Sequence, residues 1–80
     1  MAMKYIVFED NYTAAEFVVI FASYIPHDAM ARMIAVKGTP VRAGSFSMQE
    51  FDCYGQSISL GLKSDPEKDN KLIERDMNSY

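Results

Sequence analysis

Hydrophobic and polar residues repeat with short periods along the chain, and each period predicts one element of secondary structure. The stretch "MKYIVFE" (3–9) is rich in β-branched and aromatic residues, which is typical of a strand. The segment "EFVVIFASY" (16–24) is apolar at both odd and even positions, which indicates a strand that is central in its sheet or covered on both faces. In "PHDAMARMI" (26–34) the apolar residues recur at helical spacing, so a short helix is expected.

The second half of the chain predicts two further strands and a second helix. The segments "TPVRAGSFSM" (39–48) and "FDCYGQSISL" (51–60) alternate with period two, and a turn at 49–50 separates them. In 51–60, we expect the tyrosine, isoleucine and leucine on one face and the cysteine and serines on the other. The last helix is expected from about residue 66 to 77, with a narrow apolar stripe.

The predicted order of elements is therefore β-β-α-β-β-α, in a single small domain that covers residues 1–80. Two hairpins, each followed by a helix, most simply give an α+β fold with a four-stranded antiparallel sheet and two helices on one face. Gly44 and Gly55 lie inside predicted strands, which indicates a β-bulge or the close approach of another backbone segment.

The segment "GLKSDPEKDNKLIER" (61–75) contains a glycine, a lysine and a serine just before the last helix, as a phosphate-binding loop does. In that loop the glycine directly precedes the lysine, whereas a leucine separates them here. Helix capping explains the segment better. Two caps fit equally well: Ser64 in a capping box with Glu67, or Asp65 followed by a proline.

The net charge of −3, from 8 basic and 11 acidic residues, disfavours direct binding of nucleic acid. The only cysteine cannot form an intrachain disulfide, which indicates a reducing compartment. The longest apolar run, 17–22, is far shorter than the ~20 residues that span a bilayer. We therefore expect a cytoplasmic protein with no signal peptide, membrane anchor or membrane partner.

His27 and Cys53 are the residues that most resemble a base and a nucleophile. We expect His27 at a helix start and Cys53 packed as a small apolar residue, so no enzymatic activity is expected. The clustered carboxylates lie near turns and a helix cap, without the spacing of a calcium loop. Neither a metal nor a cofactor is expected.

Six methionines are a high count for a chain of this length. We expect Met30 and Met33 to fill gaps in the core against the sheet. Because methionine is flexible and polarisable, a methionine on the surface would instead suit an adaptable contact with another protein.

The segment "CYGQSISLGLKSDPEKDNKLIER" (53–75) resembles the C-terminal part of short, uncharacterised proteins of bacteriophages and prophages. In those proteins a Tyr-Gly strand ends in a Ser-Leu-Gly-Leu-type turn and enters a Leu-Ile-Glu-Arg helix. The opening "MKYIVFED" and the region of His27 fit the same outline. The resemblance implies an inhibitor of host defence, such as an anti-CRISPR protein that binds an effector complex in the bacterial cytoplasm. It carries no residue roles over to this chain.

The first functional hypothesis is accordingly a phage-derived inhibitor that binds a host protein complex, for example a CRISPR effector, through acidic surface residues. The candidate partner-binding residues are Glu9, Asp10, Glu50, Asp52, Asp65, Glu67 and Asp69. A second hypothesis is a binder of a nucleotide signal on a serine-bearing face of the sheet. Its candidate ligand-binding residues are Arg42, Ser45, Tyr54 and Ser57. A third is a non-enzymatic assembly module in which an edge strand pairs two copies into a homodimer.

Overall fold

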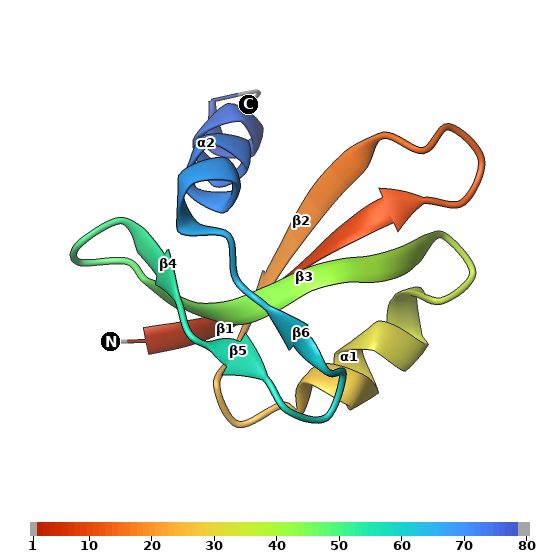
Figure 1. Cartoon of the computed structure of the whole chain (residues 1–80), viewed down its shortest axis with the longest axis horizontal. Coiled ribbons are helices and arrows are strands. Elements are labelled where there is room, and N and C mark those ends of the chain that lie inside the picture. Colours follow the sequence, from red (N-terminus) through yellow and green to blue (C-terminus); the bar gives the residue numbers. More distant parts are fainter. Residues whose placement is uncertain (1, 79–80) are drawn as a thin grey trace.

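The computed structural model describes residues 2–78, and its elements are shown in Figure 1. In chain order they are β1 (Ala2–Asp10), β2 (Glu16–Phe21), α1 (His27–Ile34), β3 (Gly38–Ser47), β4 (Asp52–Tyr54), β5 (Gln56–Ser57), β6 (Leu62–Lys63) and α2 (Pro66–Met77). One antiparallel sheet has the strand order β2-β1-β3-β4, and β5 and β6 form a separate hairpin. The α+β class and the four-stranded antiparallel sheet are confirmed. The predicted order ββαββα is wrong, because the β5–β6 hairpin stands between β4 and α2.

Strand β1 is central because its middle residues are apolar on both faces. Tyr5, Ile6, Val7 and Phe8 are all fully buried. The strand pairs with β2 on one side and with β3 on the other. Tyr5 and Val7 contribute to the core on one face of the sheet, and Ile6 and Phe8 contribute to the core on the other.

The two helices lie on opposite faces of the sheet, each over its own core. The α2-side cluster consists of Tyr5, Val7, Phe46, Cys53, Leu72 and Ile73. The α1-side cluster consists of Ile6, Phe8, Phe21, Met30, Ala31 and Ala43. The prediction of both helices on one face was therefore wrong. A sheet that is apolar on both faces needs cover on both, and a helix with one narrow apolar stripe covers only one.

Strand β2 is an edge strand that is nevertheless covered on both faces. Val18 and Ile20 pack against the α2-side cluster, and Phe17 and Val19 pack against the α1-side cluster. Of the two alternatives that its uninterrupted apolar pattern left open, cover on both faces is confirmed and a central position is not.

The predicted strand 51–60 is interrupted at Gly55, whose φ is +77°. A left-handed residue turns the chain out of the sheet, so β4 ends at the residue before it. The buried face of this segment is the one that carries the cysteine, and the tyrosine and isoleucine lie on the exposed face. Cys53 and Ser57 are buried, whereas Tyr54 and Ile58 are exposed.

Gly44 in β3 lies close to the backbone of β4. A Cβ atom at Gly44 would lie 2.5 Å from the carbonyl oxygen of Tyr54, which confirms the predicted close approach of another segment. The β-bulge of this sheet lies elsewhere, where the β1–β3 register shifts between Val7 and Phe8.

Of the two possible caps of α2, the structure uses the aspartate. The carboxylate of Asp65 accepts a hydrogen bond from the Lys68 amide at 3.3 Å, and Pro66 follows at the first helical position. The Ser64 hydroxyl donates instead to the carbonyl of Gly55 at 2.8 Å. The serine therefore anchors the chain that leads from β6 to the helix.

Candidate functional site

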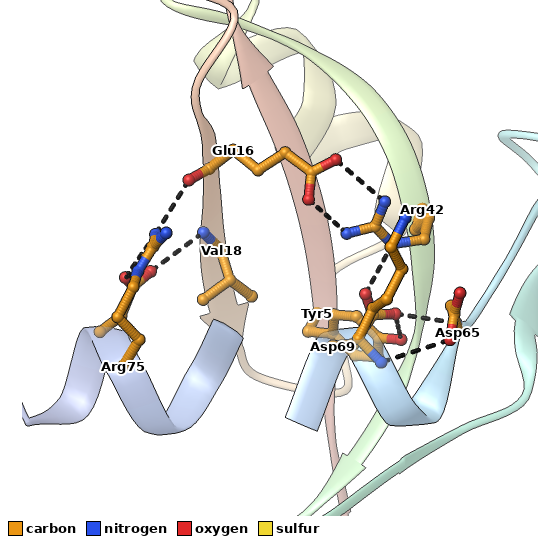
Figure 2. A network of polar contacts seen from close by, with 9 residues as sticks. Tyr5, Glu16, Val18, Arg42, Asp65, Asp69 and Arg75 are labelled. Carbon is orange, nitrogen blue, oxygen red and sulfur yellow. Dashed lines mark hydrogen bonds and ion pairs between the residues drawn. The ribbon is translucent and has the colours of Figure 1, made fainter. Parts of the chain in front are cut away.

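A polar network joins α2 to three strands of the sheet (Figure 2). Asp69, from the first half of α2, is fully buried. Its carboxylate accepts from the Tyr5 hydroxyl at 2.5 Å, from Arg42 Nε at 2.6 Å and from the Asp65 amide at 2.9 Å. The other guanidinium nitrogens of Arg42 donate to both carboxylate oxygens of Glu16, at 2.6 and 3.0 Å.

The pKa shifts in this network arise from burial and from the bonds that its members make to one another. Burial, followed by the hydrogen bond to Asp69, raises the pKa of the Tyr5 hydroxyl. The hydrogen bonds from Arg42 lower the pKa of Glu16, and the hydrogen bonds to Glu16 raise the pKa of Arg42 in turn. Because Arg42 already holds two carboxylates, it is not available to bind a ligand or a partner.

Three of the acidic candidates for partner binding have local structural roles. Asp69 is buried in the network, so it cannot reach a partner in this structure. Asp65 caps α2. The Asp10 carboxylate accepts from the amides of Tyr12 and Thr13 at 2.8 and 3.1 Å, and these bonds lower its pKa. The turn and cap positions of Asp10 and Asp65 account for them without a partner.

The remaining acidic candidates are exposed but do not form one patch. Glu9 lies at the end of β1 that pairs with the start of β3. Glu50 and Asp52 lie beyond the opposite end of β3, in the turn that leads into β4 and at its start. Glu67 is in the first turn of α2. The candidates are thus divided between separate regions, and only Glu50 and Asp52 are close in the chain.

The structure does not bring the candidate ligand-binding residues together. Arg42 lies on the α2 face of the sheet, within the network. Ser45 and Tyr54 are cross-strand partners on the α1 face. Ser57 is buried, and its hydroxyl accepts from the Leu60 amide at 3.2 Å, so it shapes the turn of the β5–β6 hairpin. The nucleotide-signal hypothesis therefore has no assembled site here.

His27 and Cys53 lie on opposite faces of the sheet. His27 is buried, and its Nε2 lies 2.9 Å from the carbonyl oxygen of Gly44. Cys53 belongs to the α2-side cluster, where burial raises the pKa of its thiol to about 12. The thiol is therefore protonated at neutral pH, and the two side chains do not form a nucleophile–base pair. Among residues 2–78, no group of three His, Cys, Asp or Glu side chains is placed to hold a metal.

The turn between β3 and β4 combines the features of an interaction site. We name Met48, Glu50, Phe51 and Asp52 the hairpin tip. Met48 is 51% exposed and Phe51 is 37% exposed, and both carboxylate-bearing residues are exposed as well. In Figure 1 this turn extends away from the body of the molecule.

Contacts with neighbouring elements also anchor the hairpin tip. The Phe51 ring packs edge-to-face on Phe46, with ring centroids 5.2 Å apart. The hydroxyl of Ser47 accepts from the amide of Glu50 at 3.2 Å. Asp52 accepts from the side-chain amide of Asn70 in α2 at 2.9 Å. Contacts with β3 and α2 thus fix a segment that the sequence presents only as a turn.

Only one of the two methionines that were predicted to lie in the core is buried. Met30 is buried against the sheet as expected, but Met33 is 72% exposed, so its prediction as a core residue was wrong. Met33 lies on α1 but does not belong to the α1-side cluster. Met48 and Met77 are exposed as well, at 51% and 48%, and exposed methionines suit an adaptable contact with another protein.

A basic groove along α2 was not predicted. It has a volume of about 290 Å³ and is lined by Glu16, Lys68, Lys71, Leu72 and Arg75. The three basic residues recur at intervals of three and four, which places them on one helix face. This spacing is visible in the sequence, but the net negative charge of the whole chain conceals a local cluster of basic residues.

Neither helix within residues 2–78 is long and apolar enough to cross a membrane. No protein-family model, curated protein or solved structure matches the chain. The function therefore has to be inferred from the chemistry of this chain's own surface.

Proposed function

We propose that this chain is a small binding module that docks onto a basic protein surface through the hairpin tip and acts by occupying that surface. The observation that carries the proposal is the combination of exposed Met48 and Phe51 with the carboxylates of Glu50 and Asp52 on one short, ordered turn.

The two kinds of side chain have complementary roles in such a contact. Methionine and aromatic residues are enriched at the centres of protein interfaces, where their burial supplies affinity. Carboxylates at the rim accelerate the encounter with a basic surface and select against acidic ones. The hairpin tip has both kinds in adjacent positions, whereas the acidic residue at the far end of β1, Glu9, neighbours another carboxylate in the chain.

The order of the hairpin tip lowers the penalty for binding. A loop that must be fixed on association loses about 0.5–1.5 kcal/mol for each immobilised side chain. Here Phe51 already packs on Phe46, and Asp52 already accepts from Asn70. Less conformational entropy is therefore lost when a partner binds.

The resemblance to phage proteins suggests the setting of this contact. Surfaces that hold nucleic acid are rich in lysine and arginine, so an acidic hairpin can compete with nucleic acid for them. This supports an inhibitor of a host defence complex in the bacterial cytoplasm, of the anti-CRISPR type. The target complex would be blocked by occupation, with no chemical step.

The test is capture of a partner from bacterial lysate on the immobilised protein, followed by measurement of its affinity. The double variant Met48→Ser/Glu50→Lys removes one apolar contact and reverses one charge at the hairpin tip. The control Glu9→Lys makes the same charge reversal at the opposite end of β3. We expect the double variant to weaken binding at least tenfold, since centrally placed interface residues are worth about 2 kcal/mol or more, and the control to bind like the wild type.

Two results would contradict the proposal. One is equal weakening by Glu9→Lys, which would mean that only total charge matters. The other is unchanged binding of the double variant, which would place the contact elsewhere. Circular dichroism of each variant verifies that the fold is retained.

A further inference from the structure

The sheet has two edges, and side chains of α2 reach both of them. At the β4 edge, the side-chain oxygen of Asn70 accepts from the Cys53 amide at 2.7 Å. This strand is only three residues long, so capping its central amide leaves little edge for another strand to join.

The β2 edge is capped at one end only. Arg75 Nη2 donates to the carbonyl of Glu16 at 3.0 Å, and an Asp76 carboxylate oxygen accepts from the Val18 amide at 3.4 Å (Figure 2). Both backbone groups therefore point away from β1, towards the outside of the sheet. No such contact of α2 with the edge continues past the Val18 amide in the described part of the chain.

The direction of the next backbone N–H and C=O groups along β2 follows from the geometry of an antiparallel strand. In an antiparallel strand, alternate residues direct their N–H and C=O to the same side. The carbonyl of Val18 and both backbone groups of Ile20 therefore also face outwards, and the amide of Ala22 is the next in this series. No hydrogen bond to these groups is present within residues 2–78, whereas the Ala22 carbonyl accepts from the Ile25 amide at 3.1 Å.

The unpaired groups are symmetric about Ile20. If a second β2 lay antiparallel with the two Ile20 residues opposite each other, the Ile20 residues would exchange both of their hydrogen bonds. Each Val18 carbonyl would then accept from the Ala22 amide of the other copy. The two groups left over in this register, the Val18 amide and the Ala22 carbonyl, are those already bonded to Asp76 and to the Ile25 amide. The capping thus leaves open the set of groups that a second copy would use.

An apolar groove adjoins the same stretch of edge. It has a volume of about 160 Å³ and is lined by Val18, Ile20, Ile73, Asp76 and Met77. Met77 is 48% exposed. A neighbouring strand at this edge would remove part of this apolar surface from water, which adds to the stabilisation from the backbone bonds.

From this geometry we propose that the chain forms a symmetric homodimer in which two β2 strands pair antiparallel, in the register centred on Ile20. The two four-stranded sheets then become one continuous sheet. The inference is independent of the proposed function, because the hairpin tip lies next to β4, at the other edge of the sheet.

The test measures molecular mass by sedimentation equilibrium. The wild-type chain, 9.1 kDa as a monomer, is expected to sediment with twice that mass. A chemically synthesised chain with an N-methyl group on the Ile20 amide lacks the central donor but keeps every side chain and every bond to β1. It is expected to be monomeric. The control is N-methylation of Glu16, whose amide also points outwards but lies outside the paired stretch, and this chain should remain dimeric.

Three outcomes would overturn the proposal. The first is a wild-type chain that stays monomeric up to about 1 mM, a dissociation constant that corresponds to only about 4 kcal/mol of binding free energy. The second is a dimer that persists after N-methylation of Ile20. The third is a dimer that both modifications dissociate equally, which would exclude this register. Circular dichroism and the melting temperature of each chain verify that the monomer fold is intact.

Discussion

Replacing Asp69 with asparagine is the most informative perturbation of this fold, because it removes one buried charge without changing the shape of the side chain. The carboxylate is fully buried and accepts from Tyr5, Arg42 and the Asp65 amide. An asparagine offers one acceptor oxygen where the aspartate offers two, and its amide group faces donors instead of acceptors.

The expected loss in the free energy of unfolding depends on the hydrogen bonds that the variant retains. Removing one partner of a buried ion pair typically destabilises a protein by about 3–5 kcal/mol. We expect the lower end for Asp69→Asn, since Arg42 keeps both bonds to Glu16. At about 0.05–0.15 kcal/mol per residue, a domain of this length has a total stability of only about 4–12 kcal/mol. The variant should therefore be markedly less stable and at the edge of folding at physiological temperature.

A double-mutant cycle with Tyr5→Phe tests whether the network acts as a unit. The single variant Tyr5→Phe should lose about 1–2 kcal/mol, because Asp69 keeps its bonds from Arg42 and from the Asp65 amide. In the Asp69→Asn background the same change should have a much smaller effect, with a coupling energy of about 0.5–3 kcal/mol between the two sites.

The assay is urea unfolding monitored by circular dichroism at pH 7, with the dependence on urea concentration fitted for each variant. Glu74→Gln, which removes an exposed carboxylate from the same helix, is the control and should change the free energy of unfolding by less than about 0.5 kcal/mol. A loss below about 1 kcal/mol for Asp69→Asn would contradict the expected role of the buried carboxylate, and so would strictly additive effects in the cycle. Either result would mean that the network adds little beyond the apolar packing of α2.

Two further predictions concern the packing around β4. Gly44→Ala places a Cβ atom 2.5 Å from the Tyr54 carbonyl oxygen, so it should destabilise the fold by about 1–3 kcal/mol in urea unfolding; a loss no greater than that of the neighbouring Ser45→Ala would show that the strands separate freely. The folded state favours the protonated thiol of Cys53, whose pKa is raised from 9.0 to about 12, so this contribution to stability is complete below pH 9 and is lost as the pH rises towards 12. Urea unfolding of wild type and Cys53→Ala at pH 8 and pH 10 should show the steeper decline in the wild type, and equal declines would contradict the assignment.

The hairpin tip and the β2 edge lie at opposite edges of the sheet, so one surface does not obstruct the other. In the proposed dimer the two hairpin tips would stand at the two ends of the continuous sheet. A partner with repeated basic sites could then be bound at two points, and the second contact would form at a high effective concentration.

Several local elements of this protein could be predicted from neighbouring residues in its sequence. The β-branched stretch 3–9 lies within β1, the helical spacing after Pro26 matches α1, and Asp65 with its following proline starts α2. These features depend on neighbours a few residues apart, through backbone preference, side-chain period and capping. For the same reason the α+β class and the antiparallel sheet could be predicted.

The positions of these elements and the internal bonding of the polar groups depend on contacts between residues that are distant in the chain. Which face each helix covers depends on two separate apolar cores, and a strand's period does not specify that choice. The burial of Asp69 depends on Tyr5 and Arg42, which are 64 and 27 residues away in the chain. From its neighbours in the sequence, a carboxylate in the first half of a helix would be expected to be exposed. Its burial is tolerated only because donors that are distant in the chain bond to it. The bond that α2 makes to the hairpin tip and the bond that it makes to the edge of β2 likewise join residues 18 and 58 positions apart in the chain.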